Sequence, residues 1–509
     1  MFPKLAKRIP WKPGHFRRLS YPVQPLSEPI PLAGSTIARE KAKSHSSDTK
    51  ITYLENGLRV ASQEAFGQYS TIGVFVDAGS RYEVNYTSGV SHLLQKLAFQ
   101  STSNFHSREE LMQELDKYGG VFECQRFRDI MMYSLSVFSF AVPQAVKVLA
   151  DAVWRPQLKE SELESERQTI KFELEGLIGP NVEPLLIDLI HQAAYRDNTL
   201  GLPSLPSEEN LDKVSAHELK TYLASHYSPS RMVLAGVNVD HDSLVRHVRE
   251  HFAVAANSTA WGGVESLPVD QSVAQYTGGK AMVSREGPAV IGPNPLPDLT
   301  HVILAMESSS YLEEDFFAFA VLNSLMGGGG SFSAGGPGKG IFTQLYLNVL
   351  NQHHWVYSAQ AQNHAYADSG IFCILGSAHP SDARNLTEVL CQQFYSMTLP
   401  PKESDLTRAK KQLQSAMMMN LESRLIVFED IGRQVLGQGK KLSPKELYDK
   451  IEAVTCKDVQ RAGERMMGCG NPALAALGDL TNVPSMTDVT RALSNKGHLP
   501  RKSQLFPFR

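Results

Sequence analysis

Residues 214–219 read VSAHEL, and residues 454–459 read VTCKDV, roughly 240 positions further along the chain. Each is followed by an apolar run led by a proline, Pro229 to Gly236 and Pro472 to Gly478, which we interpret as strands. The repeated order predicts an internal duplication.

Other segments repeat at nearly the same offset. ESEL at 160–163 opens a helical pattern to about Leu177, and ESDL at 403–406 opens one to about Leu421. The first copy begins with a hairpin signal at Asn56-Gly57, a strand over 71–76 and a helix over 88–99. The second copy repeats this strand and this helix, with a strand over 301–306 and a helix over 313–326. We therefore predict an α+β protein with two homologous lobes, 49–253 and 273–509, joined by a linker at 254–272.

The composition is that of an ordinary globular protein, with 42% hydrophobic and 20% charged residues in 509. A net charge of -3 gives no electrostatic basis for binding nucleic acid. No apolar run reaches 18 residues, so no membrane span is expected. The cysteines are few and unpatterned, which indicates a reducing compartment or inert buried thiols: Cys124, Cys373, Cys391, Cys456 and Cys469.

The first 24 residues contain basic residues and no acid, the composition of a mitochondrial transit peptide. Arg17-Arg18-Leu19-Ser20 resembles a cleavage pattern with arginine three residues before the cut, so we predict cleavage after Leu19. Prolines interrupt any long helix here, and a plain basic tail is the alternative. We expect residues 1–48 to be this peptide followed by a disordered Pro/Ser-rich segment.

The helix over 88–99 carries an altered metal-binding motif, His92-Leu93-Leu94-Gln95-Lys96. An H-x-x-E-H helix binds zinc through two histidines and uses the glutamate as a base, and a later glutamate completes the coordination. Glu173 lies 77 residues past Lys96, near the expected place of that distal ligand. Lys96 would repel a cation, and Gln95 has no useful basicity. We therefore expect no metal and no catalytic residue in this chain, and hypothesise a Lys96–Glu173 ion pair at the metal's position. The alternative is that His92 and Lys96 are ordinary helix residues.

A glycine-rich segment, GGGGSFSAGGPGKG, occupies residues 327–340. It lacks the first glycine and the hydroxyl of a Walker A loop and does not supply G-x-G-x-x-G, so nucleotide binding is not expected. Glycine is the most freely moving residue, and Phe332 and Lys339 would give such an arm contacts for extended peptides. The predicted substrate-binding residues are Gly327, Gly328, Gly329, Gly330, Ser331, Phe332, Ser333, Ala334, Gly335, Gly336, Pro337, Gly338, Lys339 and Gly340.

This segment and the one after it, IFTQLYLNVL at 341–350, resemble the signature of the α subunits of mitochondrial processing peptidases, in the pitrilysin-like inverted-zincin superfamily. ESSSYLEED at 307–315, MMMNLESR at 417–424 and the tail from Pro500 to Arg509 carry the same resemblance. The α pattern of that family usually has glutamate at the position of Gln95 and phenylalanine at that of Leu93. This chain is therefore further from catalysis than such relatives.

The resemblance implies half of a clamp-like heterodimer in the mitochondrial matrix, with the zinc held by a catalytic β subunit and no cofactor in this chain. The chain would recognise basic presequences without cutting them, and an association with the inner membrane stays open. Basic peptides favour carboxylates in the cavity. The candidates, each with ordinary surface charge as its alternative, are Glu307, Glu313, Glu314, Asp315, Glu422, Glu429 and Asp430.

Two other functions are compatible with parts of the sequence. Related two-lobed proteins are structural core subunits of the cytochrome bc1 complex, but such a subunit has no use for the glycine-rich segment. An independent metallopeptidase is opposed by the missing H-x-x-E-H motif, and His353, His354 and His364 match no ligand spacing.

Overall fold

The computed structural model describes residues 48–177, 182–196, 199–253, 264–285, 298–330 and 341–501. The chain divides into two units, residues 1–45 and 46–509, and all described residues belong to the second. The predicted cleavage after Leu19 and most of the glycine-rich segment, residues 331–340, lie outside the described residues.

The first half of the second unit builds one sheet. Within the described residues its strand order is β1-β2-β6-β3-β5-β4. The predicted hairpin at Asn56-Gly57 joins the first two strands, and Gly57 has a φ of 89°, which glycine adopts without strain. In chain order the strands are β1 (Thr49–Tyr53), β2 (Arg59–Gln63), β3 (Tyr69–Val76), β4 (Val121–Arg126), β5 (Met131–Phe138) and β6 (Met232–Val237).

The second half builds a matching sheet, with the order β7-β12-β8-β11-β10-β9 among the described residues. β12 runs parallel to β7 and antiparallel to β8, just as β6 runs parallel to β2 and antiparallel to β3. This agreement confirms the predicted α+β fold of two lobes. The strands are β7 (Gly279–Ser284), β8 (Thr300–Glu307), β9 (Gly328–Gly330), β10 (Val356–Ala365), β11 (Gly370–Ala378) and β12 (Ala473–Gly478).

Helices cover the two sheets. Those of the first half are α1 (Val90–Leu97), α2 (Arg108–Asp116), α3 (Val142–Trp154), α4 (Glu160–Gly176), α5 (Glu183–Ala194), α6 (Glu208–Lys213), α7 (Ala216–His226) and α8 (His241–His251). Those of the second half are α9 (Phe316–Met326), α10 (Ala383–Ser396), α11 (Glu403–Asn420), α12 (Arg424–Gln438), α13 (Pro444–Ala453), α14 (Cys456–Gly468) and α15 (Met486–Ser494). Short turns of tighter or wider helix are η1 (Ser80–Asn85), η2 (Ser139–Ala141), η3 (Thr199–Gly201), η4 (Pro229–Arg231), η5 (Tyr346–Leu350) and η6 (Pro380–Asp382).

The two repeated hexapeptides are the starts of α7 and α14. The Ser215 hydroxyl accepts a hydrogen bond from the Glu218 N–H, and the Thr455 hydroxyl accepts one from the Asp458 N–H. Each cap satisfies a backbone N–H donor at the start of its helix. The next strand, β6 after α7 and β12 after α14, follows each helix. The strand predicted from Pro229 was wrong at its beginning: β6 starts at Met232, after η4, because proline cannot donate to the sheet ladder.

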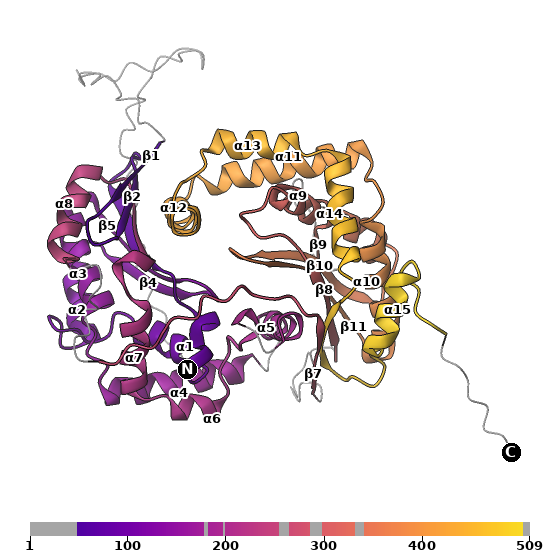
Figure 1. Cartoon of the computed structure of the whole chain (residues 1–509), viewed down its shortest axis with the longest axis horizontal. Helices are drawn as coiled ribbons and strands as arrows, with labels where there is room; N and C mark the ends of the chain where they lie inside the picture. Colours follow the sequence, from indigo (N-terminus) through magenta and orange to yellow (C-terminus); the bar gives the residue numbers. More distant parts are fainter. Residues whose placement is uncertain are drawn as a thin grey trace, which may run out of the picture. The chain divides into compact units, whose positions relative to one another are not determined.

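One helix of each half packs on the sheet of the other half. α5 packs against β7, β8 and β12, whereas α12 packs against β2, β3 and β6 (Figure 1). The two interfaces are apolar clusters in which Leu186 and Ile190 meet Ile303, and Phe428 meets Phe75. The linker region predicted at 254–272 separates the two sheets along the chain, but the packing of helices crosses that boundary.

The fit of α12 on the first sheet predicts a strong effect of a single methyl group. A Cβ at Gly432 would lie 2.0 Å from Cε2 of the Phe75 ring, which is itself fully buried. We expect Gly432→Ala to lower the free energy of unfolding by about 2 kcal/mol, measured by urea denaturation, because the helix must shift. Gly176→Ala is the matched control, since a Cβ there meets nothing within 4 Å and alanine favours helix. A neutral Gly432→Ala would contradict this packing.

One buried ion pair joins the two lobes directly. Arg81, in η1, donates from Nη1 to Asp368 Oδ1 at 3.0 Å and from Nη2 to Asp368 Oδ2 at 2.7 Å. Asp368 lies in the turn between β10 and β11, and its Oδ2 also accepts the N–H of Ala274 at 2.8 Å. The β10–β11 turn, the start of the second lobe and the first lobe therefore meet at one carboxylate, and we call the ion pair the Arg81–Asp368 latch.

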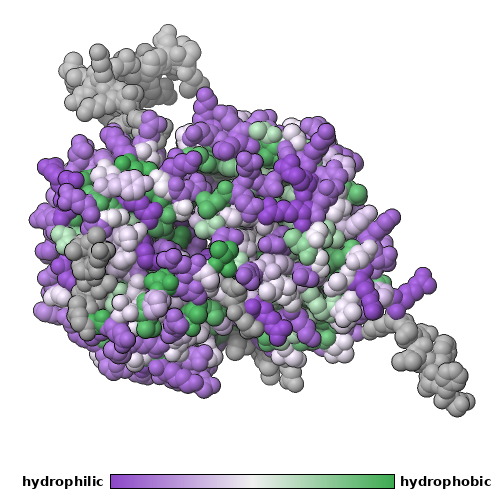
Figure 2. Space-filling model, viewed as in Figure 1, coloured by the Kyte–Doolittle hydropathy of each residue, from purple (hydrophilic) through white to green (hydrophobic). Residues whose placement is uncertain are grey.

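Helix length, surface hydropathy and the state of the cysteines complete the description of the fold. In the part of the chain that the structure describes, no helix is long and apolar enough to cross a membrane. The face drawn in Figure 2 is mainly hydrophilic, with hydrophobic residues in scattered groups. The five cysteines are free, with Cys373 and Cys391 buried and Cys469 exposed.

Candidate functional site

The structure brings the four positions of the altered metal motif together. His92, Gln95 and Lys96 lie on α1, and Glu173 lies on the neighbouring α4. Lys96 Nζ is 2.5 Å from Glu173 Oε1, and His92 Nε2 is 3.9 Å from Glu173 Oε2. The hypothesised Lys96–Glu173 ion pair is present, with the lysine where a metal-binding histidine would stand.

The surroundings of His92 are also unsuited to a cation. Burial, helped by the nearby charges of Arg126 and Lys96, lowers the pKa of His92 well below its ordinary value. Its Nδ1 is buried and has no hydrogen-bond partner, although a metal-binding histidine normally donates its second nitrogen to an acceptor. Only His92 and Glu173 could serve as ligands here, and Glu173 is already paired with Lys96, so these residues do not fit zinc. Among the described residues, no group of three or more His, Cys, Asp or Glu side chains could hold a metal ion.

Gln95, which stands where the motif has its glutamate base, makes a structural hydrogen bond. Its Nε2 donates to the backbone carbonyl of Cys124 at 3.2 Å, so the side chain lies against strand β4. An amide cannot take a proton from water at neutral pH, so Gln95 cannot act as the general base of the motif.

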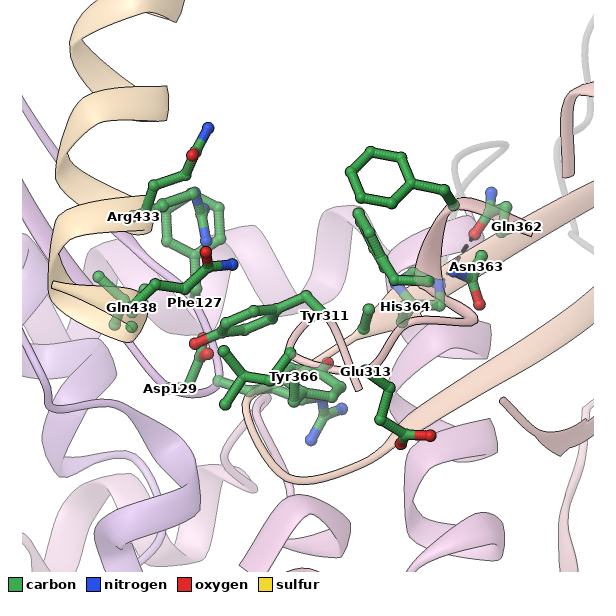
Figure 3. A pocket seen from close by; sticks show the side chains of 18 of the residues that line it. Phe127, Asp129, Tyr311, Glu313, Gln362, Asn363, His364, Tyr366, Arg433 and Gln438 are labelled. Carbon is green, nitrogen blue, oxygen red and sulfur yellow. Dashed lines mark hydrogen bonds between the residues drawn. The ribbon is translucent and has the colours of Figure 1, made fainter. Parts of the chain in front are cut away.

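A cavity of about 1850 Å³ lies in the unit formed by residues 46–509 (Figure 3). The β4–β5 turn, the start of α5, the segment after β8, the end of β10 and the end of α12 contribute to its wall. Figure 3 labels ten of these residues: Phe127, Asp129, Tyr311, Glu313, Gln362, Asn363, His364, Tyr366, Arg433 and Gln438. This volume is ample for several residues of a peptide.

Aromatic and charged groups alternate along the wall. The Arg433 guanidinium lies 3.9 Å from the centroid of the Phe127 ring and donates to Glu429 at 2.8 Å. The Tyr311 hydroxyl points toward Asp129 (Figure 3), and burial together with that carboxylate raises the pKa of Tyr311 to about 12. Tyr311 is therefore a neutral hydroxyl, available as a hydrogen-bond donor rather than a nucleophile.

Charged residues of both signs line this cavity. Its described lining residues include seven Asp or Glu and six Arg or Lys, which nearly balance. Of the seven candidates, Glu313, Glu314 and Asp430 line the wall, and Glu307, Asp315, Glu422 and Glu429 do not. Arg465 lies 2.5 Å from Glu313, which the sequence pattern does not reveal.

A histidine pair at one end of the cavity is neutral. His191 Nδ1 donates to the carbonyl of Ile187, so its Nε2 accepts from the Tyr366 hydroxyl at 2.8 Å. Burial is the main reason that the pKa of His191 lies well below its usual value and that the pKa of His364 falls to about 4. The pair supplies hydrogen bonds, and sequence spacing gave no signal for it because the two residues are distant along the chain.

The described part of the glycine-rich segment is a short edge strand. Gly328–Gly330 form β9, which pairs antiparallel with residues 358–360 of β10. Gly327 has a φ of 55° and ends α9, as a helix stop requires. The predicted roles of residues 331–340 concern positions outside the described part.

Comparisons with known proteins agree with these features. The family "Insulinase (Peptidase family M16)" matches residues 59–207, and "Peptidase M16 inactive domain" matches residues 213–413. The chain is 47% identical to mitochondrial-processing peptidase subunit alpha of Homo sapiens over 508 residues, covering 98% of this chain and 96% of the relative. It is 47% identical to the Pongo abelii protein of that name with the same coverage, and 38% identical to the Caenorhabditis elegans one, covering 93% of each chain.

Proposed function

Because the chain belongs to the M16 peptidase family, and within it to the mitochondrial-processing peptidase α subunits, we propose that it is a non-catalytic substrate-recognition subunit. In this role it binds the basic presequences of imported precursors, and a zinc-bearing β subunit cleaves them. The relatives' names imply a mitochondrial location and a β partner. The matrix as compartment, contact with the inner membrane and zinc in the partner are parts of the proposal.

The observation that carries the proposal is the contrast between the two candidate sites. Lys96 on α1 pairs with Glu173 on α4, and Gln95 stands in place of the motif's glutamate base. The cavity, in contrast, presents neutral hydroxyls, a cation–ring pair and both signs of charge over about 1850 Å³. Such a wall offers hydrogen bonds and charges to an extended peptide, which supports a role in binding. A purely structural role as a bc1 core subunit is not favoured, since the relatives found are named as processing-peptidase subunits.

The test compares the chain alone with the chain paired to a catalytic β subunit. Residues 20–509 are expressed in both forms, and cleavage of a synthetic presequence peptide is measured with and without chelator. We expect cleavage by the pair only, lost with chelator and weakened when residues 327–340 are deleted. Chelator-sensitive cleavage by the isolated chain would overturn the non-catalytic assignment. Full activity of the pair after the deletion would remove the glycine-rich segment from recognition.

A further inference from the structure

One cation in the wall of the cavity lacks a counter-ion. Of the arginines and lysines that line the cavity among the described residues, Arg126 at the end of β4 is half-buried and forms no ion pair with another described residue. Lys440 and Lys450 are exposed, so water surrounds their ammonium groups. The other three are held by carboxylates, in the pairs Arg128–Asp188, Arg433–Glu429 and Arg461–Asp315.

The guanidinium of Arg126 also has more donors than partners. Its Nη1 donates to the Ser204 hydroxyl at 2.8 Å, and its Nε is buried without a hydrogen-bond partner. Arg128, two residues later, donates to two backbone carbonyls and to Asp188. An arginine offers five N–H donors, and buried polar groups are normally hydrogen-bonded. Arg128 therefore serves the fold, whereas Arg126 has donors left for a ligand.

The carboxylates near Arg126 are engaged elsewhere. Glu83 and Asp188 exert the largest attractive charge effects on Arg126. Glu83 accepts two backbone N–H groups at the start of α1, and Asp188 accepts from Arg128 and from the Ser204 N–H. Burial is the strongest influence on Arg126 and lowers its pKa below the ordinary value, because the two carboxylates only partly offset the loss of hydration. A cation in this state gains from an anion that brings its own acceptors.

The site is reached from the cavity and is held in place. Arg126 and Ser204 both line the cavity, and the Ser204 N–H is fixed on Asp188 at 2.7 Å. Asp129, labelled in Figure 3, lies in the same β4–β5 turn, but the arginines that act on its charge are Arg433 and Arg81. The planar fork of a guanidinium matches the two oxygens of a carboxylate, which is the anion that peptides carry.

We propose that Arg126, oriented by Ser204, is a subsite for a peptide carboxylate. The proposal rests on the recognition role above and adds a chemical preference to it. A precursor offers two sources: the α-carboxylate that cleavage creates at the end of the released presequence, and the side chain of an Asp or Glu in the segment after the cut. Both present the same two oxygens, so the chemistry of binding is the same. The presequence itself is poor in acids and supplies no other.

The first test compares two presequence peptides that differ only at the C-terminus, which is a free carboxylate in one and an amide in the other. Each displaces a fluorescent presequence peptide from the complex of this chain with its β partner, with the metal chelated so that no cleavage occurs and no carboxylate binds zinc. We expect the carboxylate to bind about 10-fold more tightly, because it gains charge-assisted hydrogen bonds.

A second pair of peptides identifies the source of the carboxylate. These peptides span the cut, are amidated at the C-terminus and carry either Glu or Gln at one of the positions after the cut. A preference for glutamate assigns the side chain, and a preference within the first pair assigns the α-carboxylate. Neither measurement needs a substitution in the protein. Equal affinities within both pairs would overturn the proposal.

The protein-side test removes the guanidinium. Arg126→Gln keeps an amide donor for Ser204, and we expect it to abolish the preference for the carboxylate. Arg126→Lys keeps the charge without the planar fork and should retain part of the preference. Lys440→Gln is the matched control, because it removes an equal but exposed charge from the same wall and should leave the preference intact. A preference that persists in Arg126→Gln, or one that Lys440→Gln lowers equally, would show that Arg126 does not hold the carboxylate.

Two further readouts separate the subsite from other roles. Arg126→Gln leaves no carboxylate unpaired, so without peptide the complex should melt no lower than the parent, and a markedly lower melting temperature would mark Arg126 as a structural residue. If the complex binds peptides more tightly than the β partner alone but without a carboxylate preference, recognition stands and the subsite is wrong. If it binds them no better than the β partner alone, the recognition function itself is wrong.

Discussion

Arg81→Ala is expected to lower the free energy of unfolding by about 3 kcal/mol, because it leaves the latch carboxylate half-paired in a largely buried place. The Arg81 side chain is 8% exposed and that of Asp368 is 17% exposed. After the substitution, Asp368 keeps only the Ala274 N–H and its own hydration. Urea denaturation of the full chain measures the loss. The exposed pair Lys213–Glu209 is the comparison, and breaking it should leave the unfolding curve almost unaltered.

The same pair gives a pH dependence with a defined sign. Burial alone would raise the pKa of Asp368, but its hydrogen bonds with Arg81 and Ala274 outweigh burial and hold the pKa below the ordinary value. A carboxyl group with a lowered folded-state pKa stabilises the protein above its unfolded pKa. The advantage of the parent over Arg81→Ala should therefore be constant from about pH 5 to 8 and narrow below about pH 4. A difference in unfolding free energy between the parent and Arg81→Ala that grows as the pH falls would contradict the ion pair proposed for the latch.

Lys96→His is expected to create a zinc site where α1 meets α4. The substitution puts a second imidazole four residues after His92 on the same helix face, with Glu173 already beside both. Three protein ligands suffice for the coordination found in catalytic zinc sites. We expect about one zinc per chain after dialysis for Lys96→His, and well under one for the parent, measured by metal analysis. This readout does not depend on activity.

Lys96→Ala is the control for this experiment, and the zinc affinity of Lys96→His can also be predicted. Lys96→Ala removes the same positive charge without adding a ligand, so it should remain metal-free. His92 Nδ1 has no acceptor, so the new site should be about 10- to 100-fold weaker than one with that partner. Zinc bound by the parent, or absent from Lys96→His, would show that these residues do not occupy the geometry of a degenerate zinc site.

The sequence predicted what depends on local pattern. Strand and helix periodicities repeat within each half, so strands such as 71–76 and 301–306, and the helices that open at Glu160 and Glu403, could be anticipated. The Lys96–Glu173 pair followed from the spacing of a known motif on two helices. These inferences need only neighbouring residues or a repeated order.

Other features depend on contacts that leave no local signal. The apolar stripe of α5, with Leu186 and Ile190, has the same appearance whichever sheet it covers, so the exchange with α12 could not be predicted. Arg81 and Asp368 are single charged residues 287 positions apart. Glu314 likewise shares the cavity wall with Arg433 and Lys440, which lie far from it along the chain.

The exchange of α5 and α12 has a consequence for how the chain reaches its native state. A polypeptide that is synthesised or threaded through a pore from its N-terminus presents β6 long before α12, at 424–438, becomes available. Until then Phe75 and Val233 lack the cover that Phe428 and Ile431 later provide. Until α12 is available, the first lobe therefore has an exposed apolar face on its sheet, and the helix that covers it is encoded near the other end of the chain. Its maturation is tied to completion of the second lobe, so the two halves acquire their final form together, not in succession.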